Sequence, residues 1–123
     1  MAYIGIRKKQ PLDERQWKVI TAVKEVVRSS PFRDFAEDLI LYGSAARGSF
    51  RYDSDVDLLL VLRENAKEID DFRDAYRTLR GRLMVEEDGL PKADVHTTFG
   101  EGWKAAAETY YQEVRRDGRS VWD

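Results

Sequence analysis

Two aspartates are the residues of this chain whose type and spacing are best suited to chemistry. Asp55 and Asp57 flank Val56 at the start of an apolar run. In a β-strand both carboxylates would point to one face, about 6–7 Å apart along the chain. Two such acids repel each other, and aspartate is a poor strand former. Bound Mg²⁺ offsets this cost, because it takes oxygen ligands and is often held by one or two carboxylates together with substrate phosphates.

A third aspartate, Asp94, lies in a β-rich segment, residues 93–99, in which polar and apolar residues alternate. If this segment forms a strand beside residues 56–62, Asp94 completes a cluster of three carboxylates with the first two. Such a cluster can hold two metal ions on either side of a phosphoryl transfer and polarise an attacking hydroxyl group. His96 shares the face of Asp94 by alternation, and it is either a structural histidine or a substrate contact.

Features that suit phosphate binding precede the aspartates. An apolar run, residues 39–42, ends at Gly43-Ser44, and the small residues that follow are compatible with a short helix. Glycine lets the backbone approach a phosphate closely, and the amides at the start of a helix point at the anion. Ser44 adds a hydroxyl donor, and Arg47, one turn further on, is placed to meet phosphate charge. The sequence therefore predicts a phosphate site beside the aspartates.

Helices and strands of ordinary length are expected to position these residues. Apolar side chains at helical spacing predict a first helix that begins at Leu12-Asp13. It ends at Ser29-Ser30-Pro31, because the residue before proline is biased away from helix. Buried strands are predicted over residues 39–42 and 56–62. Before residues 93–99, a second helix is indicated by apolar residues at three- and four-residue steps, namely Ile69, Phe72, Tyr76, Leu79 and Leu83.

The C-terminal part is expected to form one more helix, which ends at Gly118, and a short strand over residues 120–122. The apolar face of this helix consists of Trp103, Ala106, Ala107, Tyr110, Tyr111 and Val114. Helices that alternate with strands predict an α/β (α+β) fold, with a mixed sheet of three to four strands covered by helices. At 123 residues the chain is expected to be a single domain, residues 1–123.

Composition limits the classes of site and partner. The chain has no cysteine and one histidine, which excludes disulfides and zinc sites built from several histidines. It has no apolar run of the ~18 residues that cross a membrane and no secretory signal, so a cytoplasmic protein is expected. A net charge of −2 argues against sequence-independent binding to nucleic acid.

Two local arginine groups are either solvated helix faces or a docking surface for an acidic partner: Arg77, Arg80 and Arg82, and Arg115, Arg116 and Arg119.

The spacing of the motifs resembles that of a known superfamily. Gly43-Ser44, ten intervening residues and then Asp55-Val56-Asp57 are similar to the signature of the polymerase-β-type nucleotidyltransferases. The small size more narrowly resembles the minimal nucleotidyltransferase (MNT) family. The resemblance extends over residues ~12–122 and implies a polymerase-β-like core. It implies that a nucleoside triphosphate is bound by Gly43, Ser44 and Arg47, and that Mg²⁺ binding and catalysis fall on Asp55, Asp57 and Asp94.

The resemblance also implies a function. MNT proteins are often encoded beside a helical HEPN-domain partner in toxin–antitoxin pairs. The expected reaction is transfer of a nucleoside monophosphate, AMP from ATP, to a hydroxyl group on such a partner, with this chain as the antitoxin. One alternative is a non-catalytic binding module that neutralises a HEPN-type partner by contact alone. Another is a homodimeric nucleotidyltransferase that acts on small molecules, similar to the antibiotic-modifying enzymes.

Overall fold

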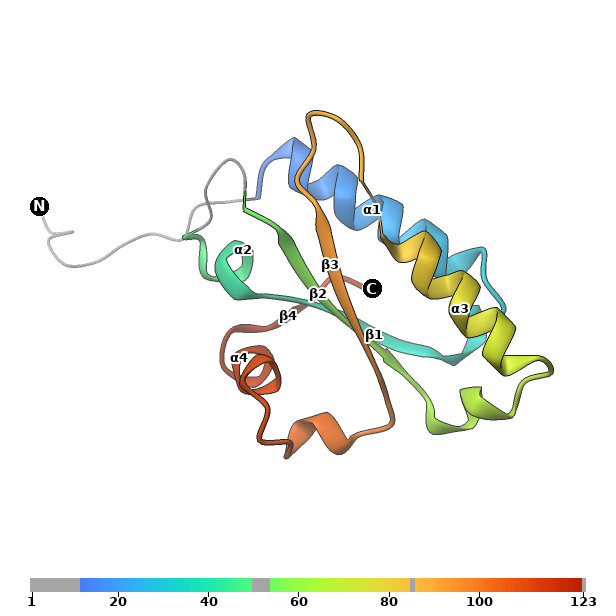
Figure 1. Cartoon of the computed structure of the whole chain (residues 1–123). Helices are drawn as coiled ribbons and strands as arrows, with labels where there is room; N and C mark the ends of the chain where they lie inside the picture. Colours follow the sequence, from blue (N-terminus) through green and yellow to red (C-terminus); the bar gives the residue numbers. More distant parts are fainter. Residues whose placement is uncertain (1–11, 50–53, 85, 123) are drawn as a thin grey trace, which may run out of the picture.

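A computed structural model describes residues 12–49, 54–84 and 86–122 of the chain. In these residues a sheet carries helices on both faces (Figure 1). The helices are α1 (Glu14–Arg28), α2 (Gly43–Arg47), α3 (Phe72–Leu83) and α4 (Thr109–Asp117). The strands are β1 (Ala36–Tyr42), β2 (Val56–Leu62), β3 (Ala93–Phe99) and β4 (Arg119–Ser120). Short 3₁₀ turns are η1 (Arg33–Phe35), η2 (Glu64–Glu68) and η3 (Gly102–Lys104).

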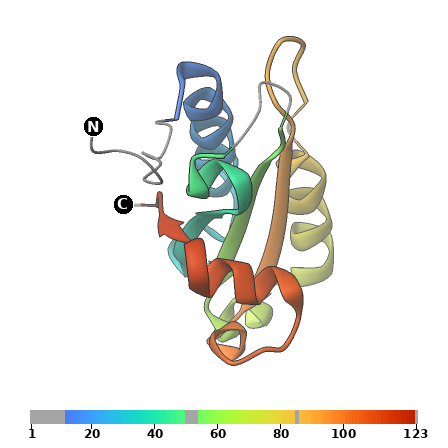
Figure 2. The ribbon, with the colours of Figure 1, turned by 90° about the vertical axis from the view of Figure 1, so that its left-hand side faces the viewer.

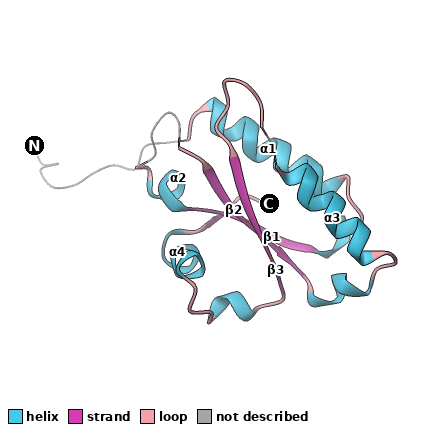
Figure 3. Ribbon diagram, in the orientation of Figure 1, coloured by secondary structure: helices cyan, strands magenta, loops and turns pink. Residues whose placement is uncertain are grey.

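The sheet is mixed, with the strand order β3-β2-β1-β4. β1 pairs antiparallel with β2 and with β4, whereas β2 pairs parallel with β3. A parallel pair needs a crossover connection, and α3 lies within that connection (Figure 3). This architecture confirms the expected mixed sheet of three to four strands covered by helices. Within the described residues, no helix has the length and apolar character that a membrane crossing requires.

Two apolar layers lie against opposite faces of the sheet. α1 and α3 cover one face (Figure 2), and the larger core lies beneath them. Its strand residues include Leu39, Leu41, Val56, Leu58, Leu60 and Leu62. The alternate strand residues face α4 and form a smaller cluster with it: Ile40, Tyr42, Leu59, Val61 and Val114. Because both faces are covered, β1 and β2 are nearly continuous apolar runs.

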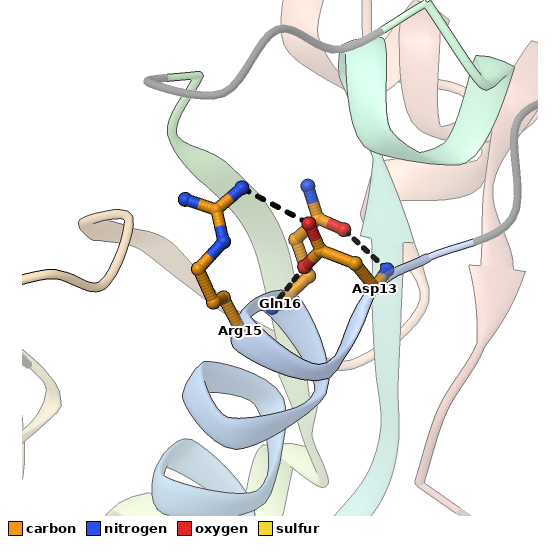
Figure 4. A network of polar contacts seen from close by, with 3 residues as sticks. All are labelled: Asp13, Arg15 and Gln16. Carbon is orange, nitrogen blue, oxygen red and sulfur yellow. Dashed lines mark hydrogen bonds and ion pairs between the residues drawn. The ribbon is translucent and has the colours of Figure 1, made fainter.

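The start of α1 is held by reciprocal hydrogen bonds (Figure 4). The amide of Gln16 donates to Asp13 Oδ1 at 3.1 Å, and the amide of Asp13 donates to Gln16 Oε1 at 2.7 Å. Arg15 Nη2 adds a 2.9 Å bond to Asp13 Oδ2. These bonds satisfy amides that have no partner inside the helix, and they hold the pKa of Asp13 below its usual value. The expected helix start at Leu12-Asp13 is therefore confirmed, with Asp13 as its cap.

The last helix differs from the sequence-based expectation. The apolar face that begins at Trp103 predicted one helix, but the structure has the turn η3, then an irregular segment, and α4 from Thr109. Arg115 donates to the carbonyls of Trp103 and Ala106, at 2.6 and 2.8 Å, and Gln112 donates to that of Ala107 at 2.6 Å. Side chains of α4 thus bond carbonyls that a continuous helix would have satisfied internally. Other elements differ less from their expected bounds. In the structure α3 starts at Phe72, β1 starts at Ala36, and β4 is Arg119–Ser120.

Candidate active site

The turn from β1 into α2 is built around Gly43. Its φ is +72°, in the left-handed region that favours glycine. A Cβ atom at this position would overlap Asp57 Oδ2, and it would lie 3.3 Å from the Cγ of the same aspartate. The carboxylate of Asp57 therefore lies directly against the backbone at the start of α2. The turn predicted to bind phosphate and the aspartate predicted to bind metal are therefore neighbours in the structure.

Asp94 lies beside Asp57. The parallel register of β2 and β3 pairs these two residues directly, and neighbours in register point to the same face of a sheet. This is the face covered by α4, since Leu59, two residues after Asp57, belongs to the cluster packed on that helix. Asp55 lies one residue before β2. The structure thus brings the three predicted aspartates to the same end of the sheet.

The electrostatics of Asp57 reflect this crowding. Its pKa is raised to about 6, first by burial and then by the negative charges of Asp94, Asp55 and Glu113. The guanidinium of Arg47 acts in the opposite direction. An ionised carboxylate here is disfavoured by its surroundings, whereas a cation would be attracted by them. The site therefore combines a partly buried acid with an excess of negative charge.

The oxygen donors of the site fit Mg²⁺ as part of its ligand set and not as a complete cage. Within the described residues, no three acidic or histidine side chains converge as a preformed metal cage. Mg²⁺ does not require such a cage, because it is usually held by one or two carboxylates plus water and substrate phosphates. Asp57 supplies a partly buried carboxylate, and Asp55 and Asp94 supply negative charge next to it. Hard oxygen donors beside a turn suited to phosphate are the chemistry that this ion needs.

The other two predicted phosphate-binding residues lie on α2. Ser44 is half-buried in its first turn, and its carbonyl accepts the amide of Ser49 at 3.0 Å. Arg47 is exposed at the end of this helix, and its Nη1 lies 3.4 Å from Asp117 Oδ2 on α4. Asp117 also pairs with Arg116 at 3.0 Å. Arg47 is thus close enough to lower the pKa of Asp57 while it links α2 to α4.

Three neighbours of the site were not singled out in the sequence. Tyr42 pairs with Asp57 across β1 and β2, and it is buried. Burial and the charges of Asp57, Asp94 and Glu113 raise the pKa of its phenol. Tyr110 of α4 stacks on His96 with ring centroids 4.5 Å apart. Tyr42 directly precedes the glycine motif, whereas Glu113 and Tyr110 come from a distant helix and carry no motif.

Comparisons with known proteins identify the family and the fold of this chain. The family model for a nucleotidyltransferase domain matches residues 18–115. The crystal structure of a candidate nucleotidyltransferase from Sulfolobus solfataricus has 25% sequence identity and a TM-score of 0.54, covering 89% of this chain and 85% of that chain. A toxin–antitoxin crystal structure with AMP-PNP has 21% identity and a TM-score of 0.51, covering 87% and 72%. A sequence comparison with curated proteins found no significant match.

The family match spans the strands and helices that carry Gly43, Asp57 and Asp94, and it extends into α4. The solved structures share the fold over most of this chain. By the family model and by the architecture, this chain belongs to the nucleotidyltransferase domain family.

Proposed function

We propose that this chain transfers AMP from ATP to a hydroxyl group on a HEPN-type partner protein, as the antitoxin of a toxin–antitoxin pair. The observation that carries the proposal is the contact between the Gly43 turn and Asp57, with Asp94 in register beside it. This arrangement supports binding of a triphosphate and a cation at one point. The choice of an adenine nucleotide and a protein partner follows the toxin–antitoxin relative that was solved with AMP-PNP.

Different residues bind the triphosphate and the metal ion. The triphosphate lies against the turn at Gly43 and Ser44, where the backbone allows close approach. Arg47 adds positive charge at the end of the same helix. Asp55 and Asp57 would hold Mg²⁺, which would supply positive charge to stabilise the phosphoryl transfer.

The chemical step is an in-line displacement. The acceptor oxygen forms a bond to the α-phosphorus, while the bond from that phosphorus to the oxygen shared with the β-phosphate breaks and pyrophosphate leaves. Asp94 accepts the proton of the hydroxyl group and later releases it to solvent. Asp94 suits this role because its side chain is 54% exposed and therefore accessible to a hydroxyl group from outside the chain.

Transfer of label tests the proposal directly. The purified chain is incubated with Mg²⁺, a candidate HEPN-type partner protein and ATP labelled at the α- or γ-phosphate. We expect the α-label on the partner protein and no transfer of the γ-label. Asp55→Asn and Asp57→Asn should abolish transfer, whereas Asp34→Asn, in η1 before the opposite end of β1, should not.

The same assay separates the alternative functions. A tight complex with the partner but no α-label transfer would favour the non-catalytic binding module. Label that reaches only small hydroxyl compounds, from a stable homodimer, would favour the small-molecule enzyme. Transfer that persists in Asp57→Asn would contradict the assignment of the site.

A further inference from the structure

A groove of about 910 Å³ lies between α3 and the first half of β3. We call it the α3–β3 groove after the two elements that border it, whose ribbons are labelled in Figure 1. Arginines of α3 form one wall, and Ala93, Asp94 and Val95 of β3 form the other. Asp94 lines the groove and is in register with Asp57, but by alternation its carboxylate lies on the α4 face of the sheet, whereas the arginines lie on the α3 face. A peptide that pairs with the outer edge of β3 would place alternate side chains on the two faces, some beside the arginines and the others beside Asp94.

The groove is basic although the chain as a whole has a net charge of −2. Its cationic residues are Arg73, Arg77, Arg80 and Lys92, and its acidic ones are Glu86 and Asp94. Two of the cations have exposed acidic partners: Arg77 lies 3.3 Å from Asp74, and Lys92 lies 3.4 Å from Glu86. Exposed pairs of this kind are weak and readily exchanged. The surface therefore favours an acidic ligand.

The strand in this groove has an open edge. β3 is the outer strand of the sheet, and within the described residues it pairs only with β2. Such an edge presents unpaired N–H and C=O groups to which an extended peptide can add as a further strand. At the end of α3, Met84 also lines the groove and is 77% exposed. An edge strand, a basic wall and an exposed apolar side chain together match an extended acidic peptide.

The aromatic residues of the groove favour a peptide over a single-stranded nucleic acid. Nucleic acids without fixed sequence are held by free aromatic faces on which bases stack. Here Phe72 and Tyr76 stack on each other at 5.5 Å and pack edge-on against Phe32 and Phe99. The guanidinium of Arg80 lies 5.8 Å from the ring centroid of Tyr76. These rings are engaged within the protein.

We propose that an extended acidic segment of the acceptor protein binds in the α3–β3 groove, adds to the free edge of β3 and brings its hydroxyl group to Asp94. This inference rests on the proposed function and names the chemistry of its acceptor. Two residues of one arginine group in the sequence, Arg77 and Arg80, then belong to the docking surface for an acidic partner, whereas the third, Arg82, lines a separate cavity.

Binding of a defined peptide tests the inference without nucleotide. The probe is a fluorescein-labelled peptide in which glutamate alternates with valine around one serine, measured by fluorescence anisotropy. The charge-reversed variant Arg73→Glu/Arg80→Glu should bind it about tenfold more weakly or worse, because like charges across an interface are strongly disfavoured. The matched control is Arg82→Glu, on the same helix but lining a separate cavity against α1, and it should bind normally.

Two further arms check the mode of binding. The charge-reversed variant should bind a peptide in which lysine replaces glutamate, which also shows that the variant is folded. N-methylation of alternate peptide amides should weaken binding, because a methylated amide cannot pair with the edge of β3. An oligothymidylate that binds more tightly than the acidic peptide, and that loses affinity in the same variant, would overturn the inference.

A parallel measurement separates this inference from the proposed function. The melting temperature with saturating Mg²⁺-ATP should rise equally in wild type and in Arg73→Glu/Arg80→Glu, because neither arginine belongs to the nucleotide site. The inference about the groove would be wrong, and the proposed function unaffected, if the melting temperature rose normally in both proteins while charge reversal left peptide binding unchanged. Peptide binding in the groove without any effect of Mg²⁺-ATP would support the docking surface and count against the function.

Discussion

The backbone of Gly43 and the carboxylate of Asp57 are in direct contact, although thirteen residues of chain separate them in the sequence. The contact leaves no room for a Cβ atom, and the φ of +72° at the glycine already disfavours any other residue. A substitution at this turn therefore acts on the proposed metal ligand Asp57 as well as on the turn itself.

Gly43→Ala should destabilise the fold and abolish binding of Mg²⁺-ATP. The left-handed conformation alone costs an L-residue about 1–2 kcal/mol, and displacement of Asp57 adds to that. Gly89→Ala is the matched control, because Gly89 has a φ of +83° but no atom within 4 Å of a built Cβ. Thermal unfolding and the Mg²⁺-ATP thermal shift measure both effects. Equal loss of stability in the two variants would contradict the contact.

Asp57→Asn should raise the melting temperature of the metal-free protein at neutral pH while it stops transfer. Burial and three neighbouring acids penalise the ionised carboxylate, and the neutral amide escapes that penalty. The gain is about 1 kcal/mol once screening by solvent at a half-exposed group is included. Asp34→Asn, on an exposed residue of η1, should change the melting temperature little. A less stable Asp57→Asn protein would show that the carboxylate is instead favoured by the fold.

The stability of the metal-free protein should depend on pH through the same group. The folded pKa of Asp57, about 6, lies above the ordinary value of 3.8, so the folded state retains the proton more strongly than the unfolded state. Its contribution to stability is therefore fully present below the ordinary value and is lost as pH rises through about 6. The gain from Asp57→Asn should accordingly be small near about pH 4 and full near about pH 8. Saturating Mg²⁺ should reduce the pH dependence of stability. Thermal unfolding at both pH values, with and without Mg²⁺, measures this effect.

Arg47→Ala should weaken Mg²⁺-ATP binding far more than it weakens the fold. Its ion pair with Asp117 is 3.4 Å long, and the arginine side chain is 41% exposed, so the pair contributes at most about 1 kcal/mol. Asp117→Asn removes the pair but keeps the guanidinium, and its nucleotide affinity should equal or exceed that of wild type. Isothermal titration of both single variants and the double variant measures the coupling. If Arg47→Ala and Asp117→Asn lost equal affinity for Mg²⁺-ATP, Arg47 would act only by its ion pair with Asp117 of α4 and not by contact with the nucleotide.

The candidate residues could be singled out in the sequence because two acids at the start of an apolar run repel each other without a cation, and a glycine that ends another run allows close approach of a phosphate. The bounds of β2 and β3 were also predictable, since strands of their length appear as short apolar or alternating runs. Their pairing was not, because a parallel register is decided by packing over a crossover and not by local pattern. Only the structure puts Asp57 level with Asp94.

The start of α4 and its place beside the site could not be predicted from the local sequence pattern, for a different reason. Helical periodicity from Trp103 onward is satisfied equally by one long helix and by a turn packed on a shorter one. The outcome depends on where Arg115 and Gln112 place their hydrogen bonds. Glu113 reaches the site only because the chain folds back at this point. A surface glutamate has no signal in sequence that marks such a position.

The unequal apolar layers have a consequence for native-state hydrogen exchange. α1 buries four aliphatic side chains completely, whereas the buried residue of α4 is Val114 alone. Local opening requires less free energy where less apolar surface is buried, so amides of α4 should exchange well before those of α1. Each opening carries Glu113 away from Asp57 and removes one of the negative charges that raise its pKa. The affinity of the site for protons and cations is thus coupled to the brief opening of one short helix.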